Sequence, residues 1–287
     1  MSSSRPVLFL VSAEAGCVRA DPETPHVSVM DLGVTRGDGI FETISVCDGR
    51  AQALEPHLAR FARSARLLDL PEPDLDLYRR AVLAAIEAHD DVAELYVKTV
   101  MTRGIEGTGV PTGWAYAAEA GDFARARTEG IRAVTLDRGL RHDVAQTSPW
   151  LLQGAKTLSY AVNRAALREA ERRDADDVIF TSSDGYVLEG PTANVILRRG
   201  DTLVTPRTDQ GILAGTTQAS VFDFAHSIGL ATEYAVVPVA ELASADALWL
   251  VSSVRQAVPI NSLDGVEREI DAELSARMTA YLLGRRE

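Results

Sequence analysis

Two short stretches in the second half of the chain carry side chains suited to nucleophilic and acid–base chemistry. Lys156 lies among small and apolar neighbours, just before a predicted helix. Partial burial disfavours the charged form of a lysine, so a side chain held there would offer a nucleophilic amine. Glu189 closes one predicted strand and Asn194 stands in the next, so both side chains would face a common cleft. Taken singly, Lys156 and Glu189 each fit a solvent-facing side chain better.

The elements that must position these residues follow from hydrophobic periodicity and turn signals. Apolar residues that recur every three or four positions predict helices, and alternating β-branched runs between turn residues predict strands. In the first part we predict strands over 7–11, 40–47, 94–103 and 113–119, and helices over 55–69 and 75–89. In the second part we predict strands over 131–136, 178–182, 186–189, 193–197, 202–205 and 247–253, and helices over 159–173 and 216–229.

The predicted strands occur in runs beside separate helices, without strict alternation of strand, helix and strand. This pattern predicts an α+β, or mixed α/β, architecture in two halves. We expect a smaller N-terminal domain over 1–119, a linker over 120–130, and a larger C-terminal domain over 131–287 that carries Lys156.

Composition argues against several classes of protein. The chain has 287 residues, with 29 Lys and Arg against 41 Asp and Glu, which gives a net charge of −12. This surplus of negative charge repels a phosphate backbone, so we expect no nucleic-acid partner. Apolar runs are shorter than the roughly 20 residues that span a bilayer, so we expect no membrane segment. Two cysteines and five scattered histidines predict neither a disulfide framework nor a metal site, and favour a cytoplasmic protein.

Five motifs occur in the order that is typical of one enzyme family. They are Arg-Gly-Asp-Gly-Ile-Phe-Glu-Thr at 36–43, His-Leu-Ala-Arg at 57–60, Lys156 with Asn163, Glu189-Gly190 with Asn194, and Gly-Ile-Leu-Ala-Gly-Thr-Thr at 211–217. Over about residues 28–260 the chain resembles the class IV, or fold-type IV, pyridoxal-phosphate enzymes. This group includes D-amino-acid and branched-chain aminotransferases and 4-amino-4-deoxychorismate lyases.

The resemblance implies a two-domain fold-type IV structure and pyridoxal 5′-phosphate as the cofactor. Lys156 would hold the cofactor covalently and move protons, and Glu189 would keep its pyridine nitrogen protonated. The cofactor phosphate would be bound by Arg60, Thr216, Thr217 and Ser253, with Asn194 in a supporting role. Independently, Thr216 opens a predicted helix, whose first N–H groups attract an anion. Ordinary helix capping by the same threonines is compatible with this role.

Predicted substrate contacts favour a lyase within this family. Thr43 stands where some lyases have a threonine linked to proton transfer, and the motif 205–210 resembles a lyase sequence. A dianionic substrate needs cations, for which we expect Lys98, Arg103 and Arg255 to serve. The resemblance therefore implies elimination of pyruvate from 4-amino-4-deoxychorismate, which gives 4-aminobenzoate for folate synthesis.

Two alternatives stay open on the sequence. One is an aminotransferase of D-alanine or branched-chain amino acids, although Gln218 stands where transaminases often have an arginine. The other is a binding or scaffold protein that kept the fold and lost the chemistry. Because the family usually pairs subunits, the resemblance also implies a homodimer.

Overall fold

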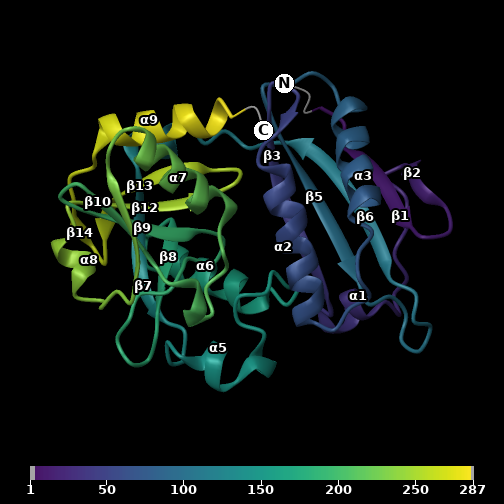
Figure 1. The fold of residues 1–287 in the computed structure, drawn as a ribbon, viewed down its shortest axis with the longest axis horizontal. Helices are drawn as coiled ribbons and strands as arrows, with labels where there is room; N and C mark the ends of the chain where they lie inside the picture. The colour runs from purple at the N-terminus through teal and green to yellow at the C-terminus, as the bar shows by residue number, and fades with distance from the viewer. Residues whose placement is uncertain (1–3, 286–287) are drawn as a thin grey trace. The chain divides into compact units, whose positions relative to one another are not determined.

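The computed structural model describes residues 4–285, and the chain forms two compact units, each with its own sheet (Figure 1). Unit 1 contains residues 4–121, 155–160 and 285, and unit 2 contains residues 122–154 and 161–284. The predicted mixed α/β architecture is confirmed. No helix of the described residues combines the length and the apolar character needed to cross a bilayer.

The division into units differs from the predicted domains in two places. The expected linker over 120–130 holds a helix, α4 (Ala124–Glu129), which belongs to unit 2. The segment 155–160, which includes Lys156, packs with unit 1 instead of the C-terminal part of the chain around it. Sequence periodicity could not indicate this packing, because the segment is too short to show a period and its partners lie far earlier in the chain.

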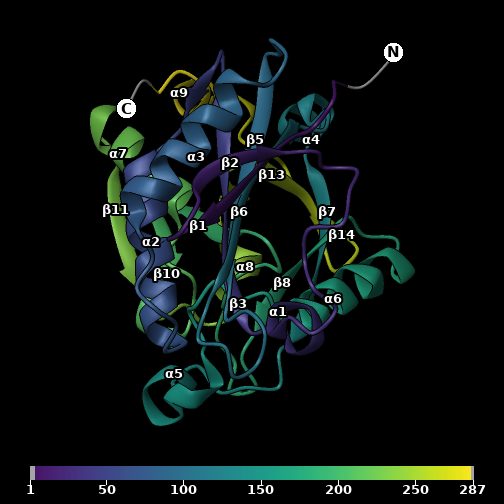
Figure 2. The ribbon, with the colours of Figure 1, turned by 90° about the vertical axis from the view of Figure 1, so that its right-hand side faces the viewer.

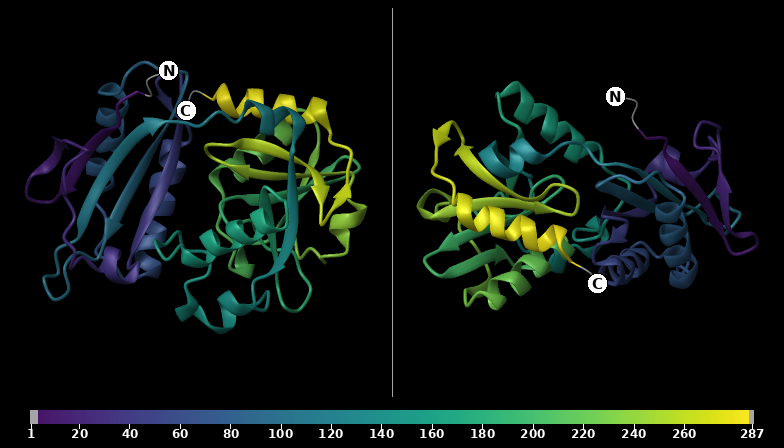
Figure 3. Two further views of the ribbon diagram at one scale, coloured as in Figure 1. Left: turned by 180° about the vertical axis from the view of Figure 1, so that it is seen from behind. Right: turned by 90° about the horizontal axis from the view of Figure 1, so that it is seen from above.

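Unit 1 is built on a six-stranded antiparallel sheet with the order β2-β1-β6-β5-β3-β4. Its strands are β1 (Val7–Ser12), β2 (Gly16–Ala20), β3 (Gly39–Cys47), β4 (Arg50–Ala51), β5 (Glu94–Thr102) and β6 (Thr112–Glu119). Its helices are α1 (Leu32–Arg36), α2 (Leu54–Leu67) and α3 (Leu75–Glu87). Helices α2 and α3 pack on one face of this sheet (Figures 1 and 2), and Figure 3, left, shows the sheet from its other face.

Alternation along β3 decides which of its side chains meet the helices. Ile40, Glu42 and Ile44 point to the helix-covered face and are buried. Phe41 and Thr43 point to the opposite face and are half-buried. The buried apolar side chains of α2 recur at helical spacing, at Leu58, Phe61, Ala62 and Ala65. A strand that buries one face and half-exposes the other can therefore carry two different groups of functional side chains.

The segment 155–160 extends the sheet of unit 1 at the edge of β3. The Leu158 N–H donates to the Gly39 carbonyl at 2.8 Å, and the Phe41 N–H donates to the Lys156 carbonyl at 3.1 Å. The sequence places Lys156 just before a helix over 159–173, and α6 (Ala161–Arg172) begins two residues later than predicted. Lys156 therefore precedes the helix, as predicted, and lies at the edge of the sheet of unit 1.

Unit 2 contains an eight-stranded mixed sheet with the order β11-β10-β9-β12-β13-β7-β8, and β14 pairs with β13. Its strands are β7 (Ile131–Asp137), β8 (Asp177–Thr181), β9 (Asn194–Arg199), β10 (Thr202–Pro206), β11 (Ala231–Ala235), β12 (Ala247–Ser252), β13 (Gln256–Leu263) and β14 (Val266–Glu267). Besides α4 and α6, its helices are α5 (Val144–Thr147), α7 (Thr216–Ser227), α8 (Glu241–Ser244) and α9 (Ala272–Leu283), with 3-10 turns η1 (Pro149–Leu151) and η2 (Thr208–Gln210).

The central strands of unit 2 are buried on both faces. Val195 and Leu197 of β9 belong to one apolar cluster, whereas Ile196 between them belongs to a second cluster that includes side chains of α7 and α9. Burial on both faces explains why β12 carries a continuous apolar run without alternation.

The stretch 186–189, which the sequence predicts as a strand, pairs irregularly. The Leu188 N–H donates to the Phe180 carbonyl at 2.9 Å, but Tyr186 forms an isolated bridge to Pro238. Because the stretch pairs with two partners in turn, no regular ladder forms. Glu189 therefore lies in irregular backbone next to β8.

Candidate active site

Lys156 is held by two elements of unit 1. Its backbone N–H donates to Ser64 Oγ of α2 at 3.2 Å, and its carbonyl accepts from the Phe41 N–H of β3 at 3.1 Å. Its Nζ lies 4.5 Å from the centroid of the Phe41 ring. A cation is attracted by the face of an aromatic ring, so Phe41 helps to direct the side chain.

Lys98 approaches the same ring from β5. Its Nζ lies 5.9 Å from the Phe41 centroid. Lys98 and Lys156 are the two lysines of the chain, so both of them converge on Phe41. Tyr160 adds a ring that meets Phe41 edge-on, with the centroids 5.4 Å apart.

Thr43 belongs to the same neighbourhood. It lies two residues after Phe41 on β3 and is the direct partner of Lys98 in the β3–β5 pairing. Directly opposed side chains in an antiparallel pair stand roughly 5 Å apart at Cβ. The structure thus places Lys156 and Lys98 near one aromatic ring, and it places Thr43 opposite Lys98 in the sheet.

Arg60 is held in a buried ion pair on the helix-covered face of β3. Its Nε donates to Glu42 Oε1 at 2.7 Å, and its Nη2 donates to Glu42 Oε2 at 2.6 Å. His57, three residues earlier on α2, places its Nδ1 2.7 Å from the same Oε2. Glu42 is 1% exposed and Arg60 is 9% exposed. Glu42 therefore fixes the plane of the Arg60 guanidinium.

The charges of this buried group follow from its contacts. Burial alone would raise the pKa of Glu42, but the Arg60 guanidinium and the hydrogen bonds from Arg60 and His57 hold it well below its usual range. Burial lowers the pKa of His57 despite its hydrogen bond to Glu42, and the positive charges of Arg60 and Lys156 lower it further. At neutral pH the group carries one carboxylate, one guanidinium and a neutral imidazole. The sequence marks Glu42 and His57 only as members of motifs, because their mutual contact joins a strand to a helix.

Glu189 and Asn194 meet at Leu213 in unit 2. Glu189 Oε2 accepts from the Leu213 N–H at 3.1 Å. Asn194, the first residue of β9, donates from Nδ2 to the Leu213 carbonyl at 2.8 Å. The two side chains predicted to share a cleft therefore bind the two polar backbone groups of one residue.

The N-terminus of α7 has the features of an anion site. Gly215 is the N-cap residue of α7 and has no side chain to cap the helix. The first N–H groups of a helix point out of its N-terminus and attract an anion. Thr216 and Thr217 are buried there, and Thr217 Oγ1 donates to Ser253 Oγ at 3.4 Å. A Cβ at position 215 would lie 1.9 Å from Asn194 Oδ1, so glycine is required. The three hydroxyl residues predicted to bind a phosphate are thus gathered at one helix end.

A small pocket lined by Glu189 also contains two polar residues to which the sequence gave no role. Gln210 is 4% exposed, and neither its amide nitrogen nor its oxygen has a hydrogen-bond partner within residues 4–285. Arg138 lies 4.7 Å from the centroid of the Phe180 ring and forms no ion pair in the described part of the chain. An uncompensated cation and an unsatisfied amide in one pocket leave room for a polar partner. Gln210 belongs to the motif 205–210, but no sequence signal marks Arg138.

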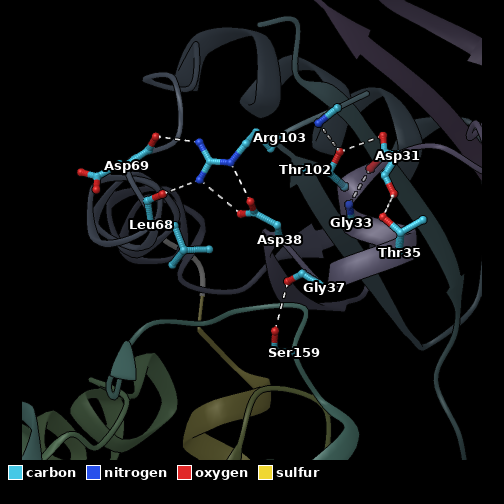
Figure 4. A network of polar contacts seen from close by, with 11 residues as sticks. Asp31, Gly33, Thr35, Gly37, Asp38, Leu68, Asp69, Thr102, Arg103 and Ser159 are labelled. Carbon is cyan, nitrogen blue, oxygen red and sulfur yellow. Dashed lines mark hydrogen bonds and ion pairs between the residues drawn. The ribbon is translucent and has the colours of Figure 1, made fainter. Parts of the chain in front are cut away.

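Arg103, one of the expected substrate ligands, has a guanidinium that is hydrogen-bonded to groups of unit 1. Its Nε donates to Asp38 Oδ2 at 2.6 Å, its Nη2 to the Leu68 carbonyl at 2.7 Å, and its Nη1 to the Asp69 carbonyl at 3.0 Å (Figure 4). The hydrogen bond to Asp38 raises the pKa of Arg103, so the guanidinium stays charged. The substrate contact of Arg103 stays a prediction, and the structure adds Asp38 as its partner within unit 1.

Arg255 also forms an ion pair with a carboxylate of its own unit. Its Nη2 donates to Asp177, which is 1% exposed. Releasing Arg255 toward a substrate would leave that buried carboxylate without its counter-charge. Of the three expected substrate cations, Lys98 is the one that forms no ion pair within the described residues.

One group of side chains in unit 2 is of types that bind metals, namely His142, Asp143 and Asp184. His142 Nδ1 lies 2.7 Å from Asp184 Oδ2, and Arg141 Nη2 lies 3.5 Å from the same oxygen. Protein groups already compensate this carboxylate, and we assign no metal to it.

The chain matches the family of class IV amino-transferases over residues 39–263. It is 46% identical to the bifunctional aminodeoxychorismate lyase/D-amino acid transaminase of Mycobacterium tuberculosis over 256 residues, which cover 85% of this chain and 88% of that protein. A solved fold IV transaminase from Curtobacterium pusillum is 59% identical, with a TM-score of 0.96 and 98% of each chain covered. A structure titled as a hypothetical aminotransferase from Mycobacterium tuberculosis, in its PLP-bound form, is 41% identical, with a TM-score of 0.90 and coverage of 97% of this chain and 100% of that chain.

The fold of both units and these similarities define a fold-type IV enzyme. The chain belongs to the class IV aminotransferase family, and its cofactor is pyridoxal 5′-phosphate, as the resemblance implies. The described residues fit this cofactor. The N-terminus of α7 beside Gly215 suits a phosphate, the Lys156 amine suits an aldehyde, and the Glu189 carboxylate suits a protonated ring nitrogen.

Proposed function

We propose that this enzyme is an aminodeoxychorismate lyase, which removes pyruvate from 4-amino-4-deoxychorismate and leaves 4-aminobenzoate for folate synthesis. The observation that carries the proposal is the placement of Lys156 and Lys98 near the Phe41 ring, with Thr43 directly opposite Lys98 in the sheet. An elimination needs a base, a proton donor for the leaving oxygen, and a cation for the substrate carboxylates. An amine, a hydroxyl and an ammonium group supply these functions. The bifunctional Mycobacterium tuberculosis relative supports the same activity.

The cofactor is assigned to the residues that the sequence predicts for it. Lys156 would bind its aldehyde, and Glu189 would hold the proton on its ring nitrogen. Its phosphate would be bound by Arg60, Thr216, Thr217 and Ser253. Asn194 supports this arrangement by fixing the loop at Leu213. When bound, pyridoxal phosphate draws electrons from the substrate carbon that bears the amine, which makes its C–H bond acidic.

Different side chains of the protein then carry out the separate proton transfers of the elimination. The neutral amine of Lys156 takes the proton from the carbon that bears the nitrogen. The Thr43 hydroxyl assists proton delivery to the enolpyruvyl oxygen as the C–O bond breaks, and pyruvate leaves. Lys98 pairs with a substrate carboxylate. Aromatisation of the ring that remains drives the elimination forward.

Transamination of D-amino acids is the second candidate. The name of the Mycobacterium tuberculosis relative includes D-amino acid transamination, and the Curtobacterium pusillum relative is called a transaminase without a stated substrate. Both reactions start with the same proton removal, and they diverge in where that proton goes next. Gln218 weighs against a transaminase, because its buried amide donates to Tyr234 Oη at 2.8 Å in a position where transaminases often have an arginine.

One assay separates the candidates. Protein loaded with pyridoxal phosphate receives freshly made aminodeoxychorismate without any keto acid, and 4-aminobenzoate fluorescence and pyruvate are followed together. Equimolar appearance of both products, lost in Lys156→Ala, is the result expected for the lyase. If neither appears while D-alanine or leucine shifts the cofactor absorption band, the protein is a transaminase. A protein that stays colourless with added cofactor would support the inactive scaffold.

We also propose a homodimer in the cytoplasm. Two loops of unit 1 meet through a bridge between Asp31 and Ile105. Exposed apolar side chains on or beside these loops are Val29, Met30, Val34, Ile105 and Val110. Exposed apolar groups of this kind favour contact with another protein surface. Light scattering after size exclusion tests the dimer, and cell fractionation tests the location.

A further inference from the structure

We propose that Arg103 is a positioning residue for Lys156, and that it acts through Asp38 and the start of β3. The proposal rests on the role of Lys156 in the proposed function. It gives Arg103 a task other than the substrate binding expected from the sequence. The reasoning starts from what Arg103 joins together (Figure 4).

Arg103 ties the end of one helix to the start of one strand. Leu68 and Asp69, whose carbonyls accept from its guanidinium, directly follow α2. Asp38, which accepts from Nε and Nη2, directly precedes β3. The backbone N–H of Arg103 also donates to the Asp38 carbonyl at 3.1 Å. One side chain therefore fixes the C-terminal end of α2 relative to the first residues of β3.

The backbone of Lys156 is hydrogen-bonded to these same two elements, α2 and β3. Its N–H donates to Ser64, which lies about one helical turn before Leu68 on α2. Its carbonyl accepts from Phe41, three residues after Asp38. A change in the spacing of α2 and β3 would pull these two hydrogen bonds apart. Arg103 thus controls the distance across which Lys156 is held.

The turn at 37–39 adds two further attachments for the lysine segment. Ser159 Oγ donates to the Gly37 carbonyl at 3.2 Å, and the Leu158 N–H donates to the Gly39 carbonyl at 2.8 Å. A Cβ on Gly39 would lie 2.7 Å from Leu158 Cδ1, so the segment touches the turn directly. Because of these direct contacts, a shift of the turn 37–39 would also move the segment 155–160.

The ion pair itself is partly open to solvent. The side chains of Arg103 and Asp38 are 35% and 29% exposed. Pairs of this kind contribute little to overall stability, because water screens them. Loss of Arg103 should therefore disturb the position of Lys156 more than it disturbs the fold.

The experiment compares Arg103→Gln with Arg79→Gln. Arg79 also joins two helices of unit 1 through an exposed pair, with Glu55, but it contacts neither the turn nor the lysine segment. The first readout is hydrogen exchange of the segment 155–160 in protein without cofactor. We expect exchange at the Leu158 amide to rise at least about fivefold in Arg103→Gln and to stay unchanged in Arg79→Gln.

The second readout uses the loaded enzyme. We expect kcat of Arg103→Gln to fall roughly tenfold or more with little change in KM, and the pH titration of the absorption band of the lysine-bound cofactor to shift. Arg103→Lys keeps a cation for Asp38 but lacks the planar fork, so it should recover part of both effects. Asp38→Asn breaks the same pair from the other side and should reproduce them if Arg103→Gln does not fold.

Two results would overturn the proposal. Unchanged exchange and unchanged band titration in Arg103→Gln and Asp38→Asn would show that the pair does not position Lys156. A raised KM with normal kcat and normal exchange would make Arg103 a substrate ligand instead. If the wild-type protein forms no lysine-bound cofactor, the proposed function fails, and the exchange measurement still decides whether Arg103 holds the segment.

Discussion

Glu42 and Arg60 form a buried pair with two parallel hydrogen bonds, of 2.7 and 2.6 Å, between β3 and α2. Charged pairs with this geometry are among the stronger polar contacts in proteins. The pair aligns the guanidinium that the proposed function assigns to the cofactor phosphate. Its integrity should therefore affect both folding and cofactor affinity.

We expect Glu42→Gln to destabilise the protein by about 3 kcal/mol, because it leaves the Arg60 cation buried without its counter-charge. Urea unfolding of the protein without cofactor measures this loss. The Kd for pyridoxal phosphate should rise at least about tenfold, because Arg60 loses its fixed plane. Glu55→Gln, which breaks the exposed pair with Arg79, is the control and should change neither quantity appreciably. Normal cofactor affinity in Glu42→Gln would show that the buried pair plays no part in cofactor binding.

The protein without cofactor should become more stable as the pH rises toward about 6.5. Burial lowers the pKa of His57 in the folded protein, whereas the unfolded chain titrates this group near 6.5. Below that pH the unfolded chain binds one more proton, so stability falls by up to about 1.4 kcal/mol per pH unit. Glu42, whose folded pKa is lowered, adds to the loss only below about 4.5, its ordinary value.

The measurement is the free energy of unfolding from pH 7 to 5, in wild type and in His57→Gln. The variant should lose the slope that His57 contributes. His26→Gln, which changes an exposed histidine, should retain it. A slope that persists in His57→Gln would assign the pH dependence to other groups.

Lys156→Ala should abolish covalent attachment of the cofactor. Borohydride reduction followed by peptide mass spectrometry detects the attachment directly. Because the chain has two lysines, the variant leaves Lys98 as the sole remaining lysine side chain. Lys98→Ala is the matched control and should keep the adduct on Lys156. A reduced adduct on Lys98 in Lys156→Ala would contradict the assignment.

Glu189→Gln should slow turnover on the order of a hundredfold while the cofactor stays bound. An amide cannot hold the proton on the ring nitrogen as a carboxylate does, so the cofactor withdraws electrons less strongly. Steady-state kinetics and a cofactor titration measure the two effects. Glu171→Gln, an exposed change on α6, should leave both unchanged. Unaltered turnover in Glu189→Gln would remove this carboxylate from the mechanism.

Gly215→Ala should weaken cofactor binding at least about tenfold, because the new Cβ would displace the start of α7 from its anion-binding position. The nearest obstacle is Asn194 Oδ1, at 1.9 Å from that Cβ. Gly215→Ala combined with Asn194→Ala should therefore bind the cofactor better than Gly215→Ala alone. Isothermal titration with pyridoxal phosphate makes the comparison, and equal affinities in the single and double variants would disprove the steric explanation.

Much of the secondary structure could be predicted because its signals are local. The period of apolar residues predicts α2 and α3 within two residues of their observed bounds, and β3 and β5 within one. The N-terminus of α7 was placed at Thr216 from the preceding glycine and the two threonines. These predictions depend on neighbours along the chain. The helix α4 was missed because its six residues carry almost no apolar period.

The sequence by itself determined the family, the cofactor and the order of the motifs, because these depend on residue types and spacing. Only the tertiary structure decided which cations are available to a substrate. Arg103 and Arg255 are bound to Asp38 and Asp177, whereas Lys98 lies beside Phe41. It also decided that the segment of Lys156 packs with unit 1. Ion pairs and sheet edges join residues that are far apart in the chain, and local patterns carry no information about such contacts.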